Sequence, residues 1–269
     1  MIAADLRSGL TSGGPSWWPS PAGPARVIVP IDAPNALLAE AQARIVAETD
    51  ADMVEWRADY LEPTPETVHG AKVARLEQPA RLVALAATLR VLVAPKPLIF
   101  TWRTISEGGR ADSEQDAQYE AVMEAVINAH AAGLVDIEIR HPASLRLIAL
   151  AGAAGVPVIG SWHDTVGTPP EQDIVEILTL IEEAGADVAK AAVTARYEDD
   201  VTTLMSATAT RSAVASRPIF TMAMGQMGLV SRVLGYIFGS QATFATVVGT
   251  TAPGQPDLTE LRRLWAAGA

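Results

Sequence analysis

The chain has 269 residues, of which 49% are apolar, with no cysteine and a formal net charge of −11. This charge leaves no basic surface to neutralise phosphates, so we expect no nucleic-acid partner, and without cysteine neither a disulfide framework nor a thiolate site can form. No apolar run approaches the roughly 18 residues of a membrane-spanning helix, and the N-terminus lacks a signal-peptide pattern, so we expect a cytoplasmic protein without a membrane partner.

Residues 1–24 are rich in Gly, Ser and Pro and show no periodicity. This composition predicts a flexible N-terminal arm in front of one catalytic domain at 25–269. Trp17 and Trp18 are the two large apolar side chains near the end of this arm, and packing on the body or on a neighbouring subunit is the alternative to disorder for them.

From residue 26 onward, short apolar runs alternate with longer stretches at helical spacing. The predicted strands are 26–31, 53–57, 97–103, 134–139, 156–162, 187–193, 218–224 and 242–248. Predicted helices include 34–48, 112–132, 142–154, 170–184 and 257–267, and the segment 65–94 is long enough for two helices. Strands that alternate with helices predict βαβ units and a parallel sheet.

The number of these units decides between two parallel-sheet architectures. Eight units within about 240 residues match a single-domain α/β fold, the (β/α)8 TIM barrel, which typically has ~250 residues. A doubly wound open sheet is the alternative, but it usually carries a Gly-rich turn after the first strand. Here PIDAPN follows the first strand, so we expect the barrel.

Ionisable residues fall within or just after five consecutive predicted strands, the second to the sixth. They are Glu55, Arg57, Arg103, Glu107, Asp136, Glu138, His163 and Lys190. Each residue alone has a structural interpretation, such as an ion pair between Glu55 and Arg57. Because the chemistry of a parallel barrel gathers at the carboxyl ends of its strands, their convergence there favours an active site.

Lys190 is the one charged residue in the apolar run 187–193 after Asp187. A buried ammonium is costly unless it is paired or loses its proton, and an uncharged lysine is a nucleophile that forms a Schiff base with a carbonyl. A salt bridge to Glu55 or Glu138 is the alternative role. His163 on the neighbouring strand suits a general base, because an imidazole titrates near neutrality. Together these residues predict a Schiff-base lyase, either a dehydratase or a carbon–carbon lyase.

Arginines at such a site bind anions through bidentate contacts, and Arg57, Arg103 and Arg232 are the candidates. The four histidines lack metal-binding spacing. Asp136 and Glu138 could hold Mg²⁺, but a Schiff-base reaction needs no metal. We therefore expect neither a metal nor a cofactor.

Seven segments, in order, resemble type I 3-dehydroquinate dehydratase, a Schiff-base enzyme of the shikimate pathway. They are EWRAD (55–59), FTWRTISEGG (100–109), VDIE (135–138), SWHDTVGTP (161–169), DVAKAAV (187–193), FTMAMGQMGLVSRVLGYIFGSQATF (220–244) and TAPGQ (251–255). The resemblance covers roughly residues 26–260 and implies a metal-independent syn elimination of water from 3-dehydroquinate, giving 3-dehydroshikimate. It also implies a barrel and a homodimer.

The resemblance also implies roles for individual residues. Lys190 would form the imine, His163 would be the general acid and base, and Glu107 would assist and orient the histidine. The residues implied in substrate binding are Glu55, Arg57, Arg103, Arg232 (for the carboxylate), Thr251 and Gln255 (in a lid). Two positions depart from the family pattern: Thr251 replaces a usual serine, and Thr165 replaces a common aromatic residue.

Two other functions remain open from the residues alone. A Schiff-base aldolase would use Lys190 on a sugar phosphate held by GQMG (225–228) and Arg232. A non-catalytic barrel that binds an acidic metabolite is the second, since a fold does not fix a function.

Overall fold

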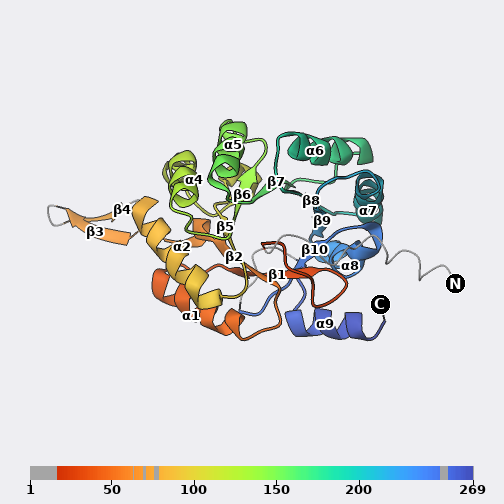
Figure 1. The fold of residues 1–269 in the computed structure, drawn as a ribbon, viewed down its shortest axis with the longest axis horizontal. Coiled ribbons are helices and arrows are strands. Elements are labelled where there is room, and N and C mark those ends of the chain that lie inside the picture. The colour runs from red at the N-terminus through yellow and green to blue at the C-terminus, as the bar shows by residue number, and fades with distance from the viewer. Residues whose placement is uncertain (1–16, 63, 69–70, 76–78, 249–253, 269) are drawn as a thin grey trace.

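Eight parallel strands form a nearly closed barrel within residues 17–62, 64–68, 71–75, 79–248 and 254–268, which the computed structural model describes (Figure 1). The strands are β1 (Arg26–Ile31), β2 (Met53–Arg57), β5 (Leu98–Thr101), β6 (Leu134–Glu138), β7 (Val158–Asp164), β8 (Val188–Thr194), β9 (Ile219–Met224) and β10 (Ala242–Phe244). Their order in the sheet is β10-β1-β2-β5-β6-β7-β8-β9. At the junction of β9 and β10, the amide of Gln241 donates to the carbonyl oxygen of Ile219 over 2.9 Å. The predicted (β/α)8 barrel is confirmed.

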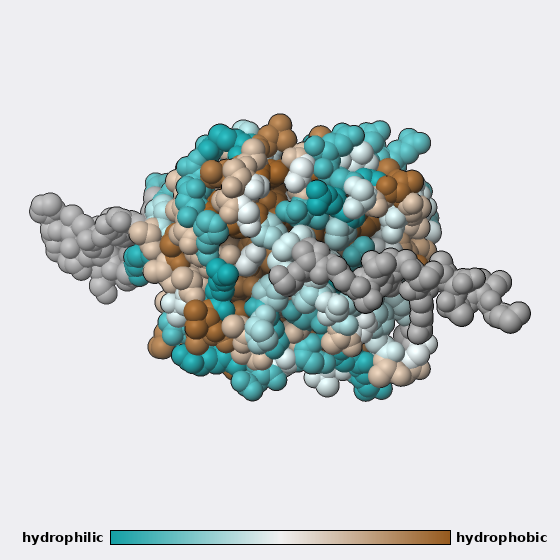
Figure 2. Space-filling view, viewed as in Figure 1, coloured by the Kyte–Doolittle hydropathy of each residue, from teal (hydrophilic) through white to brown (hydrophobic). Residues whose placement is uncertain are grey.

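Helices surround the barrel on the outside (Figure 1). In the described residues they are α1 (Ala36–Ala47), α2 (Pro79–Val93), α3 (Ser113–Asp116), α4 (Tyr119–Asn128), α5 (Ser144–Ala154), α6 (Glu171–Glu183), α7 (Glu198–Ser212), α8 (Leu229–Leu234) and α9 (Leu258–Ala266). No helix in this part of the chain is long and apolar enough to cross a bilayer. On the face seen in Figure 2, hydrophilic and hydrophobic residues are interspersed over these helices.

Two helical segments differ from the prediction. The segment 65–94 is long enough for two helices, but an antiparallel hairpin of β3 (Thr64–Val68) and β4 (Ala71–Arg75) precedes the single helix α2. Pro79 opens α2, as expected of a residue that suits a first helical turn and disrupts an interior one. The segment 112–132 divides into α3 and α4, and the carboxylate of Asp116 at the end of α3 accepts bonds from Trp102 and Ile105.

Alternate strand residues face the interior, and on β2, β6 and β7 these residues change from apolar to polar along the strand. A buried apolar cluster fills the interior: Trp18, Ile28, Met53, Ile99, Leu134, Ile159, Val188, Ala192, Phe220, Met222, Ala242 and Phe244. Most of it lies nearer the amino ends of the strands, whereas Ala192 and Met222 lie beyond Lys190 towards the carboxyl end. Two positions after Met53, Leu134 and Val188 come Glu55, Asp136 and Lys190, which share the inward face because side chains alternate along a strand. The polar residues therefore lie inside the barrel, towards its carboxyl end.

The end of the predicted arm lies at the amino end of the barrel. Trp18 is only 3% exposed and belongs to the interior cluster. The carboxylate of Asp52, which immediately precedes β2, accepts the amides of Ala22 (2.9 Å) and Val27 (2.7 Å) and so joins this segment to β1. The division of the chain at residue 24 stays a prediction, and residues 1–16 lie outside the described residues.

Candidate active site

The amine of Lys190 lies buried in the barrel interior between two carboxylates and an aromatic ring. Its Nζ donates to Oδ2 of Asp136 over 2.9 Å, lies 3.9 Å from Oε1 of Glu55, and sits 5.1 Å from the ring centroid of Phe244. The expected ion pair with Glu55 is therefore present at long range, but the main partner is Asp136 and not Glu138. Glu55 is held in place by the hydroxyl of Thr101, which donates to its Oε1 over 2.9 Å.

Arg103 is the centre of the buried charge network. Its Nη2 donates to Asp136 (2.8 Å), and its Nη1 donates to Glu138 (2.9 Å) and lies 3.3 Å from Glu107. Burial alone would lower the pKa of Arg103, but these carboxylates raise it well above its ordinary value. Burial likewise opposes ionisation of Asp136, yet Arg103 and Lys190 lower the pKa of its carboxyl to about 2. Asp136 is therefore a fixed anion between two cations.

His163 and Glu107 form the titratable pair of the site. Nδ1 of His163 lies 2.7 Å from Oε2 of Glu107, while Oε1 of Glu107 is buried without a hydrogen-bond partner among the described residues. Burial, opposed by Arg103, raises the pKa of Glu107 to about 8. Burial, with the charges of Arg103, Lys190 and Arg57, lowers the pKa of His163 well below its ordinary value. The imidazole is therefore uncharged near neutrality and can accept a proton.

Arg57 pairs with Asp59 in the structure and not with Glu55. Its Nε and Nη2 donate to the two carboxylate oxygens of Asp59, each over 2.8 Å. Asp59 also accepts the backbone amides of Arg103 (3.3 Å) and Arg110 (3.1 Å). This carboxylate thus connects the end of β2 with the loop that carries Glu107, and it is a site residue that sequence reasoning missed.

Arg232, in α8 after β9, is 2% exposed, and its Nε and Nη1 have no hydrogen-bond partner in the described part of the chain. Burial lowers the pKa of its guanidinium to about 10, so it still carries a positive charge at neutral pH. A buried cation with two unused donors is the arrangement that an anionic ligand group would complete.

Gln255 is half-buried in the loop after β10, whereas Thr251 lies outside the described residues. This loop passes directly against the loop after β9: a Cβ on Gly254 would lie 2.2 Å from the carbonyl oxygen of Gly225. Both loops follow strands at the same end of the barrel as Lys190. Arg232 and Gln255 therefore share this end of the barrel with Lys190.

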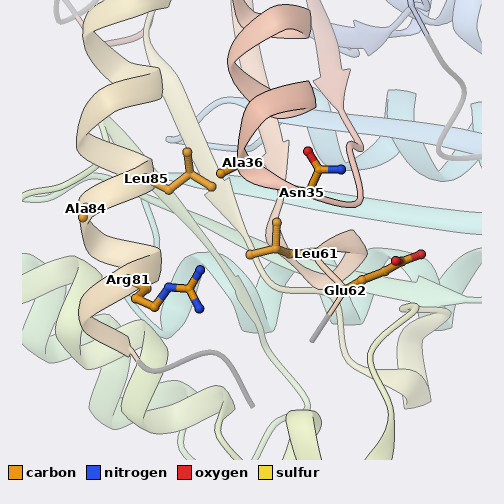
Figure 3. A pocket seen from close by; sticks show the side chains of 7 residues that line it. All are labelled: Asn35, Ala36, Leu61, Glu62, Arg81, Ala84 and Leu85. Atoms are coloured by element: carbon orange, nitrogen blue, oxygen red, sulfur yellow. The ribbon is translucent and has the colours of Figure 1, made fainter. Parts of the chain in front are cut away.

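The protein has a hollow of about 530 Å³ that opens onto the titratable pair. Its lining includes Glu107, Glu138 and His163 together with Arg140 and Trp162. Another hollow, of about 240 Å³, lies between α1 and α2 and is lined by Asn35, Leu61, Arg81 and Leu85, among others (Figure 3). The residues lining this second hollow are separate from the network around Lys190.

Sequence reasoning missed three further contacts inside the site. Ser161 donates its hydroxyl to Asp136 over 2.5 Å, Thr104 donates its hydroxyl to Glu138 over 2.6 Å, and Phe244 packs on the amine of Lys190. Ser161 and Phe244 stand on inward-facing strand positions, so the alternation of the strands was the signal that could have found them.

The model of the type I 3-dehydroquinase family matches residues 27–267 of the chain. The chain belongs to this family. A 3-dehydroquinate dehydratase of Listeria monocytogenes is 34% identical over 244 residues, which cover 90% of this chain and 92% of that protein. That of Klebsiella pneumoniae is 37% identical over 222 residues, covering 81% and 83%. The crystal structure of the Geobacillus kaustophilus enzyme superposes with a TM-score of 0.82 at 28% identity and covers 90% of each chain.

In this type I 3-dehydroquinase, the carboxylates of Asp136 and Glu138 are already engaged by protein groups. Asp136 accepts bonds from Arg103, Ser161 and Lys190, and Glu138 accepts bonds from Arg103 and from Thr104. The Mg²⁺ role considered for these two residues would have to displace those donors. The expectation that the reaction uses no metal or cofactor stays a prediction.

Proposed function

We propose that this chain removes water from 3-dehydroquinate through a Schiff base on Lys190, with His163 as general acid and base, to give 3-dehydroshikimate. Its family membership makes it a 3-dehydroquinate dehydratase, a hydro-lyase of the shikimate pathway. One observation carries the mechanism: the buried amine on β8 and the imidazole on the neighbouring strand β7 belong to one buried network, joined through Asp136, Arg103 and Glu107.

The reaction begins with a proton transfer. The nitrogen of Lys190, which is bonded to Asp136, needs a free electron pair to attack the ketone, so a proton on it must first pass to a base. Asp136, with its lowered pKa, is a poor acceptor. The His163–Glu107 pair is the better one, because the imidazole takes the proton while Glu107, whose pKa is raised to about 8, accepts the proton at Nδ1. The nitrogen then adds to the carbonyl carbon, and His163 passes the proton taken from Lys190 to the carbonyl oxygen. A second proton, relayed by His163 from the nitrogen to the same oxygen, lets it leave as water and leaves a protonated imine.

The elimination uses the imine as an electron sink. His163 removes a proton from the carbon next to the imine carbon, and the electron pair moves towards the nitrogen. The pair then returns to expel the hydroxyl group on the next carbon, which departs as water with the proton from His163. Addition of water to the imine releases the product ketone and restores the amine of Lys190.

The remaining site residues would hold the substrate. We assign its carboxylate to Arg232, because the unused donors of that guanidinium need an acceptor. Glu55, Arg57 and Arg103 would contact its hydroxyl groups and shape the site, with Asp59 and Asp136 fixing the two arginines. Gln255 and Thr251 would cover the bound substrate from the loop after β10.

Borohydride trapping tests the proposal directly. Treatment of the protein with 3-dehydroquinate and borohydride should add the mass of the reduced adduct at Lys190, and Lys190→Met should abolish the adduct. His163→Ala should turn over at least about 100-fold more slowly, as for loss of a general acid–base, yet retain part of the adduct. Intact mass spectrometry and the ultraviolet absorbance of the enone are the measurements. An unmodified wild-type protein would refute the imine, and full activity in His163→Ala would remove the histidine from the mechanism.

The aldolase and the non-catalytic barrel are set aside, because the matched family and its relatives are dehydratases.

We also propose a homodimer. Residues 218–256 contain one charged side chain, Arg232, which is buried. Exposed apolar residues lie in this segment at Met227, Leu229, Val230, Ile237, Phe238 and Val248. Two chains of net charge −11 repel one another least at such an uncharged face. The cytoplasmic location stays a prediction.

A further inference from the structure

A row of aromatic rings connects the amino end of the barrel with the amine of Lys190. The ring centroids of Trp18 and Phe220 are 6.3 Å apart, and those of Phe220 and Phe244 are also 6.3 Å apart. The ring of Phe244 then lies 5.1 Å from Nζ of Lys190. All three rings are buried, and their spacing falls in the range of packed aromatic pairs.

Trp18 is fixed at its end of this row by polar contacts. The guanidinium of Arg26, the first residue of β1, stacks on the indole at 4.5 Å, and the indole N–H lies 3.5 Å from Oε1 of Gln241, just before β10. Arg26 also donates to the carbonyl oxygen of Pro19 over 2.6 Å, which ties the residue after Trp18 to the start of β1. Trp18 thus fills the interior where the first and last strands begin.

We propose that Trp18 is a positioning residue of the reaction: it closes the interior at the amino end and, through Phe220 and Phe244, fixes the amine of Lys190. The inference rests on the proposed Schiff-base function. A lysine has a flexible four-carbon stem, and in this site Asp136 holds its Nζ while Phe244 packs against it. Phe220 is in register with Lys190 across β8 and β9, so a shift of its ring acts next to the lysine backbone.

Trp18→Ala leaves a space that Phe220 and Phe244 can enter, or that water can fill, and the amine loses its fixed position. A displacement near 1 Å at a reacting group can cost about 100-fold in rate, so we expect kcat to fall roughly 10- to 100-fold. KM should change less than about twofold, because the proposed substrate contacts lie at the opposite end of the barrel. The rate of borohydride trapping should fall with kcat, and Trp18→Phe should restore most of both.

Trp17→Ala is the matched control. Trp17 packs on Trp18 with ring centroids 6.3 Å apart but makes no ring contact with Phe220 in the described residues. It should keep the wild-type kcat and trapping rate. A thermal melt of each variant shows that the compared proteins are folded at the assay temperature.

Phe244→Leu is the second variant, which keeps an apolar side chain but removes the ring beside the amine. It should reproduce the loss of kcat and of trapping rate even if Trp18→Ala does not yield folded protein. Wild-type rates in folded Trp18→Ala, or in Phe244→Leu, would overturn the positioning role while the wild-type adduct still supports the proposed function. A wild-type protein without an adduct would instead overturn the proposed function itself.

Discussion

At the scale of single residues, the contact between Glu107 and His163 determines the pH above which the imidazole can act as a base. While Glu107 is protonated, it donates to Nδ1 and the ring proton stays on Nε2. When this pair loses a proton, the carboxylate accepts from Nδ1–H and Nε2 becomes free to act as a base. Since burial raises the pKa of Glu107 to about 8, the active form of the wild-type enzyme should increase as pH rises towards that value.

Glu107→Gln tests this titration. An amide carries no titrating proton, and the pKa of His163 is lowered by burial, so the free base should already be present at lower pH. The acid limb of the kcat/KM profile should therefore move to lower pH. kcat should fall roughly 10- to 100-fold, because no carboxylate stabilises the developing imidazolium. A profile measured between about pH 5 and 9 checks both effects. Glu260→Gln, an exposed change on α9, is the control. An acid limb at the same pH in Glu107→Gln and wild type would contradict a proton shared by Glu107 and His163.

At the scale of elements, the sequence was informative where periodicity was strong. The strands that carry Glu55, Asp136 and Lys190 could be predicted because each is a short apolar run with charged residues on one face. The hairpin β3–β4 could not, since a helix and a hairpin can both follow a loop of this composition. The ion-pair partners of the charged site residues could not be predicted from the sequence either. Arg57 is two residues from both Glu55 and Asp59, and only the turn after β2 brings Asp59 to it. The position of Trp18 depends on tertiary packing in a segment without periodicity.

Asp52 connects three elements, and this contact predicts a measurable loss of stability. Its carboxylate accepts the amides of Ala22 and Val27 and the guanidinium of Arg262 in α9. Asp52→Ala leaves the amides of Ala22 and Val27 without their acceptor, while Arg262 keeps its bond to the carbonyl oxygen of Asp50, and should lower the free energy of unfolding by about 1–3 kcal/mol. Urea denaturation measures the change. Arg263→Ala, which breaks only an exposed pair with Glu260 on the same helix, should have no measurable effect. Equal stability of the Asp52 variant and the wild type would exclude this role.

At the scale of the whole molecule, the uncharged segment 218–256 predicts how two copies meet. Ile237→Asp and Val230→Asp place a carboxylate on exposed positions of this face, 56% and 50% exposed in the single chain. If the face is the dimer interface, each variant should halve the mass measured by light scattering while circular dichroism stays unchanged. Val91→Asp on α2, at a position 76% exposed, should leave the mass unaltered. A wild-type monomer, or dimeric variants, would exclude this interface.

The close approach of Gly254 to Gly225 makes the loops after β10 and β9 mechanically dependent on one another. Both residues have positive φ angles, +80° and +88°, a region that side chains disfavour. A methyl group added at 254 would push apart the segment bearing Gln255 and the turn that leads into the helix of Arg232. A position without any side chain would thereby control how firmly the carboxylate end of the substrate is held, and Gly254→Ala should raise KM more than it lowers kcat.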